Sequence, residues 1–126
     1  MREIKFRAWC KLDKILYDWE QVKKEFTLEY FDDRGLIFQQ FTGLKDKNDV
    51  EIYEGDIVAN PNNQEKDDWY ISHHVVELYD TGFMGKQICS FGSRIGLEHW
   101  TRGENGYVVI GNIYENPELL KTKKSS

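Results

Sequence analysis

The chain of 126 residues has only two cysteines and three histidines. Cys10 and Cys89 lie far apart and form no Cys-x-x-Cys pair, so we expect two reduced thiols and neither a zinc site nor a redox pair. His73 and His74 are adjacent and would face opposite sides of a strand. His99 begins no His-Glu-x-x-His motif. The sequence therefore predicts no metal and no cofactor.

A long apolar segment is also missing. Charged and apolar residues alternate from the start, and no apolar run approaches the ~20 residues that a membrane-spanning helix needs. We therefore expect a cytoplasmic protein that does not enter a membrane. The net charge of −5 repels phosphate backbones on average, so binding to nucleic acid would need a local basic patch. The length favours a single domain, residues 1–120, followed by a polar tail at 121–126.

Alternation of apolar and polar residues is the main structural signal. It predicts a strand at 3–9 and a second strand at 15–17 that pairs back as a hairpin. Residues 15–25 fit a helix as well as a strand by periodicity, and we favour a strand followed by irregular chain. A second hairpin is expected from 26–30 and 36–41, around the turn residues 32–35.

Later strands are expected at 69–79, 83–91 and 107–110, separated by glycines. Only the end of the chain shows helix signals, because Asn116 can cap a helix and Pro117 suits its first position. Short strands at regular spacing indicate an all-β fold, either a barrel or a sandwich, with a short C-terminal helical turn.

The stretch "EIYEGDIVAN" at 51–60 places Gly55 between two hydrophobic pairs. We expect Gly55 to make a sharp bend with positive φ and Asp56 to fix that bend by accepting backbone N–H bonds. A ligand-binding role for Asp56 is the alternative. Ile-Tyr-Glu recurs at 52–54 and 113–115, either by chance, as a shared way of leaving a strand, or because Tyr53 and Tyr114 flank a common surface.

Three blocks, "MREIKFRAW", "TGLKDKNDVEIYEGDIV" at 42–58 and "VVIGNIYENPELL" at 108–120, closely resemble the YopX family of small bacteriophage and prophage proteins. The resemblance implies a mainly β, SH3-like barrel with additional hairpins and no established biochemical activity. Asn48-Asp49 departs from the Asn-Gly expected in the turn, where glycine is favoured because it tolerates positive φ. The residues that carry the resemblance, mainly structural, are Gly43, Tyr53, Glu54, Gly55, Asp56, Gly111, Asn112, Tyr114, Glu115, Asn116 and Pro117.

No catalytic motif is present. Ser93 stands in "FGSRIG", which is not Gly-x-Ser-x-Gly, and Gly85-Lys86 lacks the remainder of a phosphate-binding loop. We therefore expect no catalytic residues. The first choice is a non-enzymatic phage accessory protein that binds a phage or host protein or itself, with a homo-oligomer possible.

The alternative is weak binding of single-stranded nucleic acid. Residues 1–14 contain five basic and two acidic side chains, and basic residues beside an aromatic ring can hold a single strand. The same residues would also suit the solvated face of an edge strand. The candidate contacts are Arg2, Lys5, Arg7, Trp9, Lys11 and Lys14.

Overall fold

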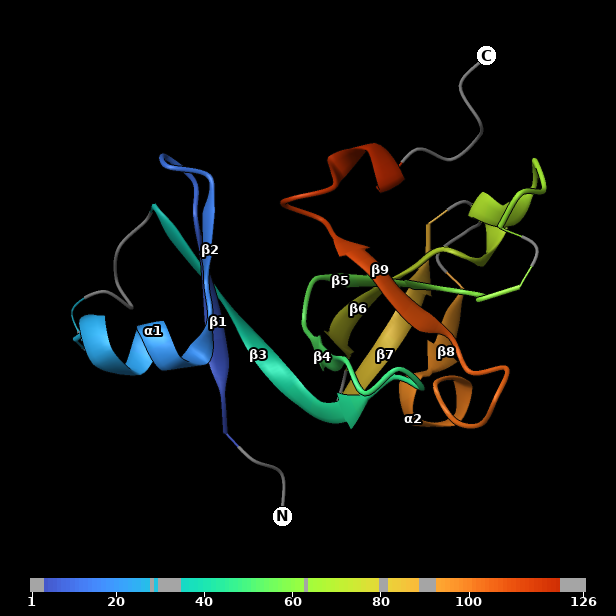
Figure 1. Cartoon of the computed structure of the whole chain (residues 1–126), viewed down its shortest axis with the longest axis horizontal. Coiled ribbons are helices and arrows are strands. Elements are labelled where there is room, and N and C mark those ends of the chain that lie inside the picture. Colours follow the sequence, from blue (N-terminus) through green and yellow to red (C-terminus); the bar gives the residue numbers. More distant parts are fainter. Residues whose placement is uncertain are drawn as a thin grey trace.

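Two antiparallel sheets make up the computed structural model, which describes residues 4–27, 29, 35–62, 64–79, 82–88 and 93–120. The first sheet has the strand order β2-β1-β3-β4 and the second β8-β7-β6-β5-β9. Figure 1 shows the two sheets on opposite sides of the molecule, with the long strand β3 running from one toward the other. One sheet forms a half-barrel, and the predicted mainly β fold class is confirmed.

The first sheet contains the expected N-terminal hairpin. Strand β1 (Phe6–Cys10) pairs with β2 (Ile15–Tyr17), so that Ala8 lies opposite Tyr17. On its other side β1 pairs with β3 (Leu36–Lys45). Strand β1 is therefore a central strand of its sheet, and the expectation of an edge strand was wrong.

The predicted hairpin of 26–30 with 36–41 was also wrong, because residues 36–40 pair with β1. Phe26 lies outside any strand, and its ring packs between those of Tyr17, at 5.3 Å, and Phe38, at 6.1 Å between centroids. Apolar alternation indicates that such residues share one face of the chain, but it does not show whether they form a strand or which strand they contact. Leu28 and Tyr30 lie outside the described residues.

Helix α1 (Trp19–Glu25) replaces the irregular chain predicted after β2. A capping box starts the helix: Asp18 Oδ1 accepts the backbone N–H of Gln21 at 2.9 Å, and Gln21 Oε1 accepts that of Asp18 at 3.0 Å. Val22 is buried where α1 packs against β1. The apolar periodicity of 15–25 fitted both a helix and a strand. The capping box, which the prediction did not consider, favours the helix.

Strand β3 links the two parts of the first sheet. After β1 it pairs with β4 (Glu51–Tyr53), and the register shifts between Phe41 and Lys45, where Gly43 has a φ of +88°. In the turn that follows, Asp49 has a φ of +67°, the conformation for which glycine was expected. The carboxylate of Asp46 accepts three backbone N–H groups, those of Asn48, Val50 and, from β9, Val109.

The second sheet is built from β5 (Asp56–Ala59), β6 (His74–Tyr79), β7 (Gly82–Gln87), β8 (Arg94–Gly96) and β9 (Val108–Asn112). The predicted strand 69–79 begins only at His74, since 69–72 form the 3-10 helix η2 (Trp69–Ser72). Side chains of η2 bond to Asn60, the residue that follows β5. Trp69 Nε1 donates to Asn60 O at 2.6 Å, and Ser72 Oγ accepts the Asn60 N–H at 3.1 Å. These bonds hold the segment in a turn.

Two further boundaries differ from prediction. The strand expected at 83–91 is β7, which ends at Gln87, and residues 89–91 lie outside the described part. A short helix, α2 (Leu97–Trp100), was not expected. The C-terminal turn is confirmed as the 3-10 helix η3 (Pro117–Leu120), and the predicted tail lies outside the description.

The core lies in and beside the second sheet, where Ile52, Val58, Val76 and Leu97 form a fully buried cluster. Burying such side chains stabilises the fold by about 1.5–3 kcal/mol each. Leu97 explains the position of α2, because it is the residue of that helix that enters the core. Over the residues that the structure describes, no helix is long and apolar enough to cross a bilayer.

Candidate functional site

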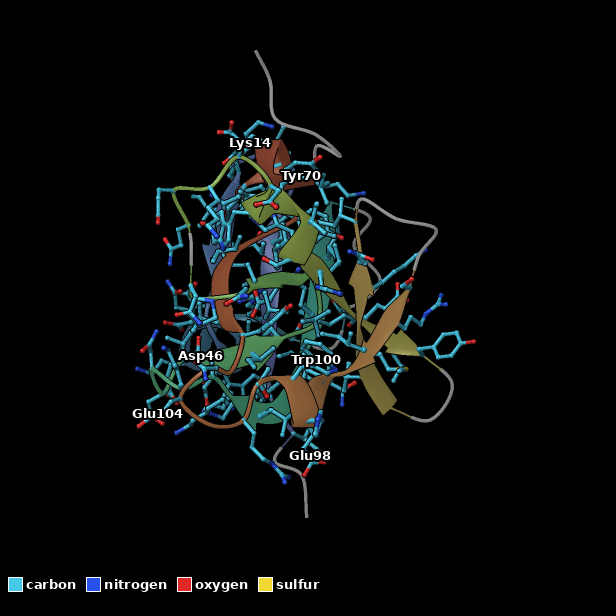
Figure 2. All side chains as sticks on the ribbon, turned by 90° about the vertical axis from the view of Figure 1, so that its right-hand side faces the viewer. Lys14, Asp46, Tyr70, Glu98, Trp100 and Glu104 are labelled. Carbon is cyan, nitrogen blue, oxygen red and sulfur yellow. The ribbon has the colours of Figure 1, made fainter. Side chains whose placement is uncertain are left out.

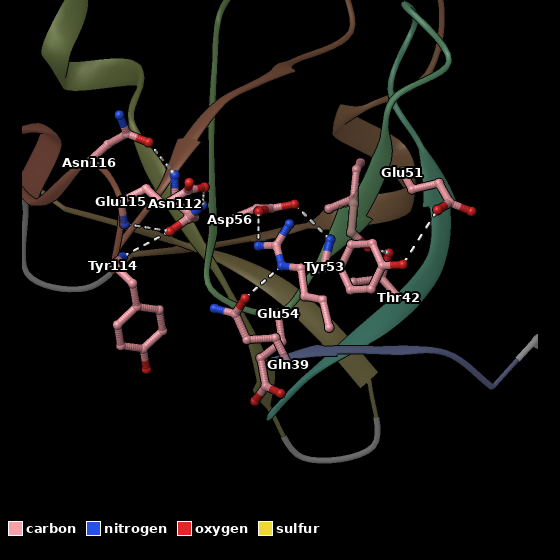
Figure 3. A network of polar contacts seen from close by, with 12 residues as sticks. Gln39, Thr42, Glu51, Tyr53, Glu54, Asp56, Asn112, Tyr114, Glu115 and Asn116 are labelled. Atoms are coloured by element: carbon pink, nitrogen blue, oxygen red, sulfur yellow. Dashed lines mark hydrogen bonds and ion pairs between the residues drawn. The ribbon is translucent and has the colours of Figure 1, made fainter. Parts of the chain in front are cut away.

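A buried ion pair connects the two sheets. Asp56, at the start of β5, pairs through Oδ1 with the guanidinium of Arg7 from β1, and its Oδ2 accepts the Tyr53 N–H at 2.7 Å (Figure 3). The side chain of Asp56 is 1% exposed and that of Arg7 12%. Burial raises the pKa of Asp56, and the Arg7 charge opposes that rise. Asp56 therefore fixes the bend, as predicted, and also holds β1 against β5.

Gly55 makes the bend with a φ of +88°, as the sequence predicts. Its N–H donates to Val76 O at 2.8 Å, and its carbonyl accepts the Ile113 N–H at 3.0 Å. A Cβ here would collide with the side-chain amide of the buried Gln39. Gln39 in turn accepts the Arg7 Nε–H at 2.6 Å through Oε1, so Gly55 leaves the space that Gln39 needs to hold Arg7.

Tyr53 and Glu54 complete this side of the network. The ring of Tyr53 lies under Arg7, 4.6 Å from guanidinium carbon to ring centroid, and its hydroxyl donates to Glu51 at 3.4 Å. Burial, followed by the negative charge of Glu51, raises the pKa of Tyr53 to about 12. Glu54 Oε1 accepts the Gln40 N–H at 3.4 Å. All these groups are engaged within the fold.

Hydrogen bonds within the third family block, 108–120, fix the turn after β9. Asn112 Oδ1 accepts the backbone N–H groups of Tyr114, at 3.0 Å, and Glu115, at 2.8 Å, while its Nδ2 donates to Glu115 Oε1 at 2.7 Å. Asn116 Oδ1 accepts the Asn112 N–H at 3.1 Å (Figure 3). A Cβ at Gly111 would lie 2.5 Å from Asn116 Oδ1. Pro117 then begins η3.

The repeated Ile-Tyr-Glu places its two tyrosines, Tyr53 in β4 and Tyr114 after β9, against the same strand, β1. Tyr53 contacts Arg7, and Tyr114 stacks on Trp9 with ring centroids 6.0 Å apart and planes inclined by 22°. Arg7 and Trp9 are two residues apart on β1 and so share one face of it. Both copies of the tripeptide therefore pack against that face.

This packing changes the interpretation of the basic N-terminal residues. Trp9 is 8% exposed, Arg7 is buried with Asp56, and Lys5 pairs with Glu51. The face of β1 predicted to be solvated is thus covered. Lys11 and Lys14 are exposed in the β1–β2 turn, and Arg2 lies outside the described residues. The described candidates do not form one open surface.

An open cleft lies instead in the region 60–107, for which the sequence predicted no site. Its volume is about 470 Å³, within the usual range of ligand-binding clefts, about 300–1,000 Å³. Figure 2 shows Trp100, at the end of α2, beside the strands of the second sheet. The main apolar and aromatic side chains of the lining are Trp69, Ile71, His74, Ile95, Trp100 and Tyr107.

Several polar groups of the cleft are bonded within the fold. His74 Nδ1 donates to Ser72 O at 2.8 Å, and burial lowers the pKa of His74, so its ring is neutral near pH 7. Gln87 Nε2 donates to Ile71 O at 2.8 Å. By contrast, the Trp100 indole N–H and the Tyr107 hydroxyl have no hydrogen-bond partner among the described residues. Trp100 is 42% exposed, and its N–H can meet a ligand.

The sequence did not predict this cleft, although "DDWYISHH" at 67–74 and "LEHW" at 97–100 contain the aromatic residues that line it. Neither cluster is a motif alone. The cleft forms because η2, β6, β8 and α2 bring them together. In the described part of the chain, no group of three His, Cys, Asp or Glu residues is placed to hold a metal ion.

The fold and the open cleft define a small two-sheet β module with a cleft beside its second sheet. Residues 13–121 match the family model described as "YopX protein", and the chain belongs to the YopX family. Its structure is similar to that of protein EF1440 from Enterococcus faecalis, with a TM-score of 0.68 and 26% identity, over 96% of this chain and 100% of that one. No curated protein matches the sequence.

Proposed function

We propose that this chain is a non-enzymatic phage or prophage accessory protein that acts in the host cytoplasm by binding a protein through the cleft of its second sheet. The observation that carries the proposal is the exposed Trp100 in an open, aromatic-lined cleft. Exposed tryptophan and tyrosine are typical of the centres of protein interfaces, because they bury large apolar area and still offer a hydrogen-bond donor.

The contacts of the family residues support a division of roles between a scaffold at the junction of the sheets and a binding surface in the cleft. Asp56, Tyr53 and Asn112 all form hydrogen bonds within the junction of the two sheets. They therefore build the scaffold, and the cleft offers the free groups. A rigid scaffold that positions a surface with free groups suits a binding module.

Charge favours a protein over nucleic acid. Lys66 is the basic residue of the cleft lining, and Asp68 lies two positions away. Such a lining offers no cationic track for a phosphate backbone, and the net charge of −5 opposes one. The alternative, weak single-strand binding at the N-terminus, would depend on the exposed Lys11 and Lys14.

The test is affinity capture from host cells carrying the phage, with quantitative mass spectrometry and a nuclease-treated arm. Three baits are compared: the wild type, Trp100→Ala, and Tyr79→Ala as a control. Tyr79 is 46% exposed, close to the 42% of Trp100, and does not line the cleft. We expect the wild type and Tyr79→Ala to capture the same proteins, with or without nuclease treatment. Trp100→Ala should lose these proteins.

Loss of all capture on nuclease treatment would favour the alternative, and capture that is equal for all three baits would contradict the cleft as the site. A second copy of the chain is also a candidate partner. Sedimentation of the wild type and Trp100→Ala tests this directly, because a dimer formed through the cleft would dissociate in the variant.

A further inference from the structure

We infer that the cleft takes an extended, uncharged, proline-rich peptide segment in the polyproline II conformation. This inference rests on the proposed function and specifies the partner chemistry. Polyproline II segments dock into aromatic-lined grooves, because their conformation is formed in advance and little entropy is lost on binding.

The aromatic rings supply the apolar surfaces. The rings of Trp100 and Tyr107 meet edge to face at 5.2 Å between centroids, with planes inclined by 74°, and His74 lies 5.7 Å from Tyr107 on another side. Trp100 ends α2, His74 begins β6 and Tyr107 directly precedes β9, and the inclined ring planes present flat surfaces in different directions. Pyrrolidine rings are compact and apolar, and they fit against such surfaces.

The free polar groups match a peptide backbone. A polyproline II chain has no internal hydrogen bonds, so its carbonyl oxygens need donors. The Trp100 indole N–H and the Tyr107 hydroxyl are donors without a partner among the residues described. Trp69 Nε1 and Gln87 Nε2, in contrast, bond to backbone carbonyls of the cleft wall, which holds the wall rigid. A rigid wall lowers the ordering cost of binding.

Other ligands fit these groups less well. A sugar carries many hydroxyls and needs many free polar partners, yet the Asn62 amide already bonds to Asn105 at 3.3 Å and the Gln87 amide to Ile71 O. A nucleic acid strand would offer bases to the rings but finds only Lys66 for its phosphates among the lining residues that the structure describes. An uncharged peptide satisfies the rings and the two donors, and it suits a lining in which the charges of Lys66 and Asp68 are opposite.

The experiment is a titration of ¹⁵N-labelled protein with decaproline, up to about 1 mM peptide. The chain has four tryptophans, so four indole N–H signals report separate places. We expect the Trp100 signal to shift downfield as its N–H bonds to a peptide carbonyl, and the Trp9 signal to stay in place because Trp9 is buried in the other sheet. A Gly-Ser decamer, oligo-dT and chitohexaose are titrated in parallel.

Trp100→Ala should weaken decaproline binding at least about tenfold. Tyr107→Phe, which removes only the hydroxyl, should weaken it by roughly threefold to tenfold. The control Tyr79→Ala should bind like the wild type. Dispersed spectra show that each variant is folded, and Tyr107→Phe keeps the test valid if Trp100→Ala is not.

No decaproline binding, binding that neither cleft variant weakens, or binding of oligo-dT or chitohexaose alone would overturn the inference. The proposed function fails separately, by the capture experiment. If Trp100→Ala loses its captured proteins although decaproline does not bind, the cleft still binds protein and only the proline-rich class is wrong.

Discussion

At the scale of single residues, glycine positions separate two physical effects. Gly55 combines a φ of +88° with a close approach of Gln39, Gly103 has a φ of +81° in open space, and Gly82 has neither constraint. An L-residue with positive φ is strained, and a collision adds to that strain. The two contributions can therefore be measured one at a time.

We expect Gly55→Ala to lower the free energy of unfolding by about 1–3 kcal/mol. Gly103→Ala should lower it by about 1 kcal/mol. Gly82→Ala should stay within about 0.5 kcal/mol of the wild type. Urea unfolding followed by tryptophan fluorescence gives all three values. Equal stability of the Gly55 and Gly82 variants would show that the bend tolerates a side chain.

The pair of Arg7 and Asp56 is the second test at this scale. Arg7→Met leaves the buried Asp56 carboxylate without its cation, and removing one partner of a buried pair costs about 3–5 kcal/mol. Lys23→Met, which breaks an exposed pair with Glu20, should cost under about 1 kcal/mol. Adding Asp56→Asn to Arg7→Met should recover part of the loss, because the unpaired charge is gone. A loss as small as that of Lys23→Met would mean that the pair does not hold the sheets together.

At the scale of elements, the cap of α1 decides between helix and strand after β2. Asp18→Ala removes the acceptor of the Gln21 N–H and should destabilise the protein by about 0.5–2 kcal/mol. Lys24→Ala, at an exposed position of the same helix, should change stability by less than about 0.5 kcal/mol. Chemical denaturation of both variants provides the comparison, and equal effects would indicate that α1 depends on packing alone.

Two buried histidines, His73 and His74 at the start of β6, should make the stability of the protein depend on pH. Burial lowers the pKa of both His73 and His74 from the ordinary value of 6.5. The unfolded chain therefore binds protons that the folded chain resists, so this contribution is complete above pH 6.5 and is lost as pH falls below it. The free energy of unfolding should drop by up to about 1.4 kcal/mol per pH unit for each histidine.

The measurement is urea unfolding over about pH 5 to 8. His74→Gln should flatten the pH dependence relative to the wild type, because it removes one of the two buried histidines. The difference between wild type and variant isolates the contribution of one histidine from that of other titrating groups. An unchanged slope in His74→Gln would contradict the prediction.

At the scale of the whole molecule, overall acidity opposes the few exposed basic side chains. We expect no binding tighter than ~10 μM to mixed-sequence single-stranded oligonucleotides near physiological salt. Fluorescence anisotropy over a range of salt concentrations measures it, because each neutralised phosphate of a single strand contributes a log–log slope of about −0.7. Tight, salt-sensitive binding that Lys11→Glu with Lys14→Glu abolishes would support the alternative function.

The predictable part of the fold was local. The β1–β2 hairpin, the bend at Gly55, the positive φ at position 49 and the turn at Pro117 each follow from a few neighbouring residues. The partner of residues 36–40 did not follow, because alternation shows that a strand has a buried face and does not show which strand pairs with it. The η2 segment was misassigned because its bonds to Asn60 reach across the preceding loop, whereas apolar alternation reports only on adjacent residues.

By itself, the sequence determined the mainly β class, the family and the backbone geometry of the family blocks, since these depend on residue types and short spacings. Tertiary structure alone decided that Arg7 and Trp9 are covered and that Trp100 and Tyr107 form a cleft. From sequence alone, a basic side chain such as Arg7 is expected to be exposed to solvent. Its burial becomes favourable only when a carboxylate lies against it, and here that carboxylate belongs to Asp56, 49 positions along the chain. The cleft likewise exists only because the fold brings η2, α2 and the strands β6 and β8 together, and with them aromatic residues from separate parts of the chain.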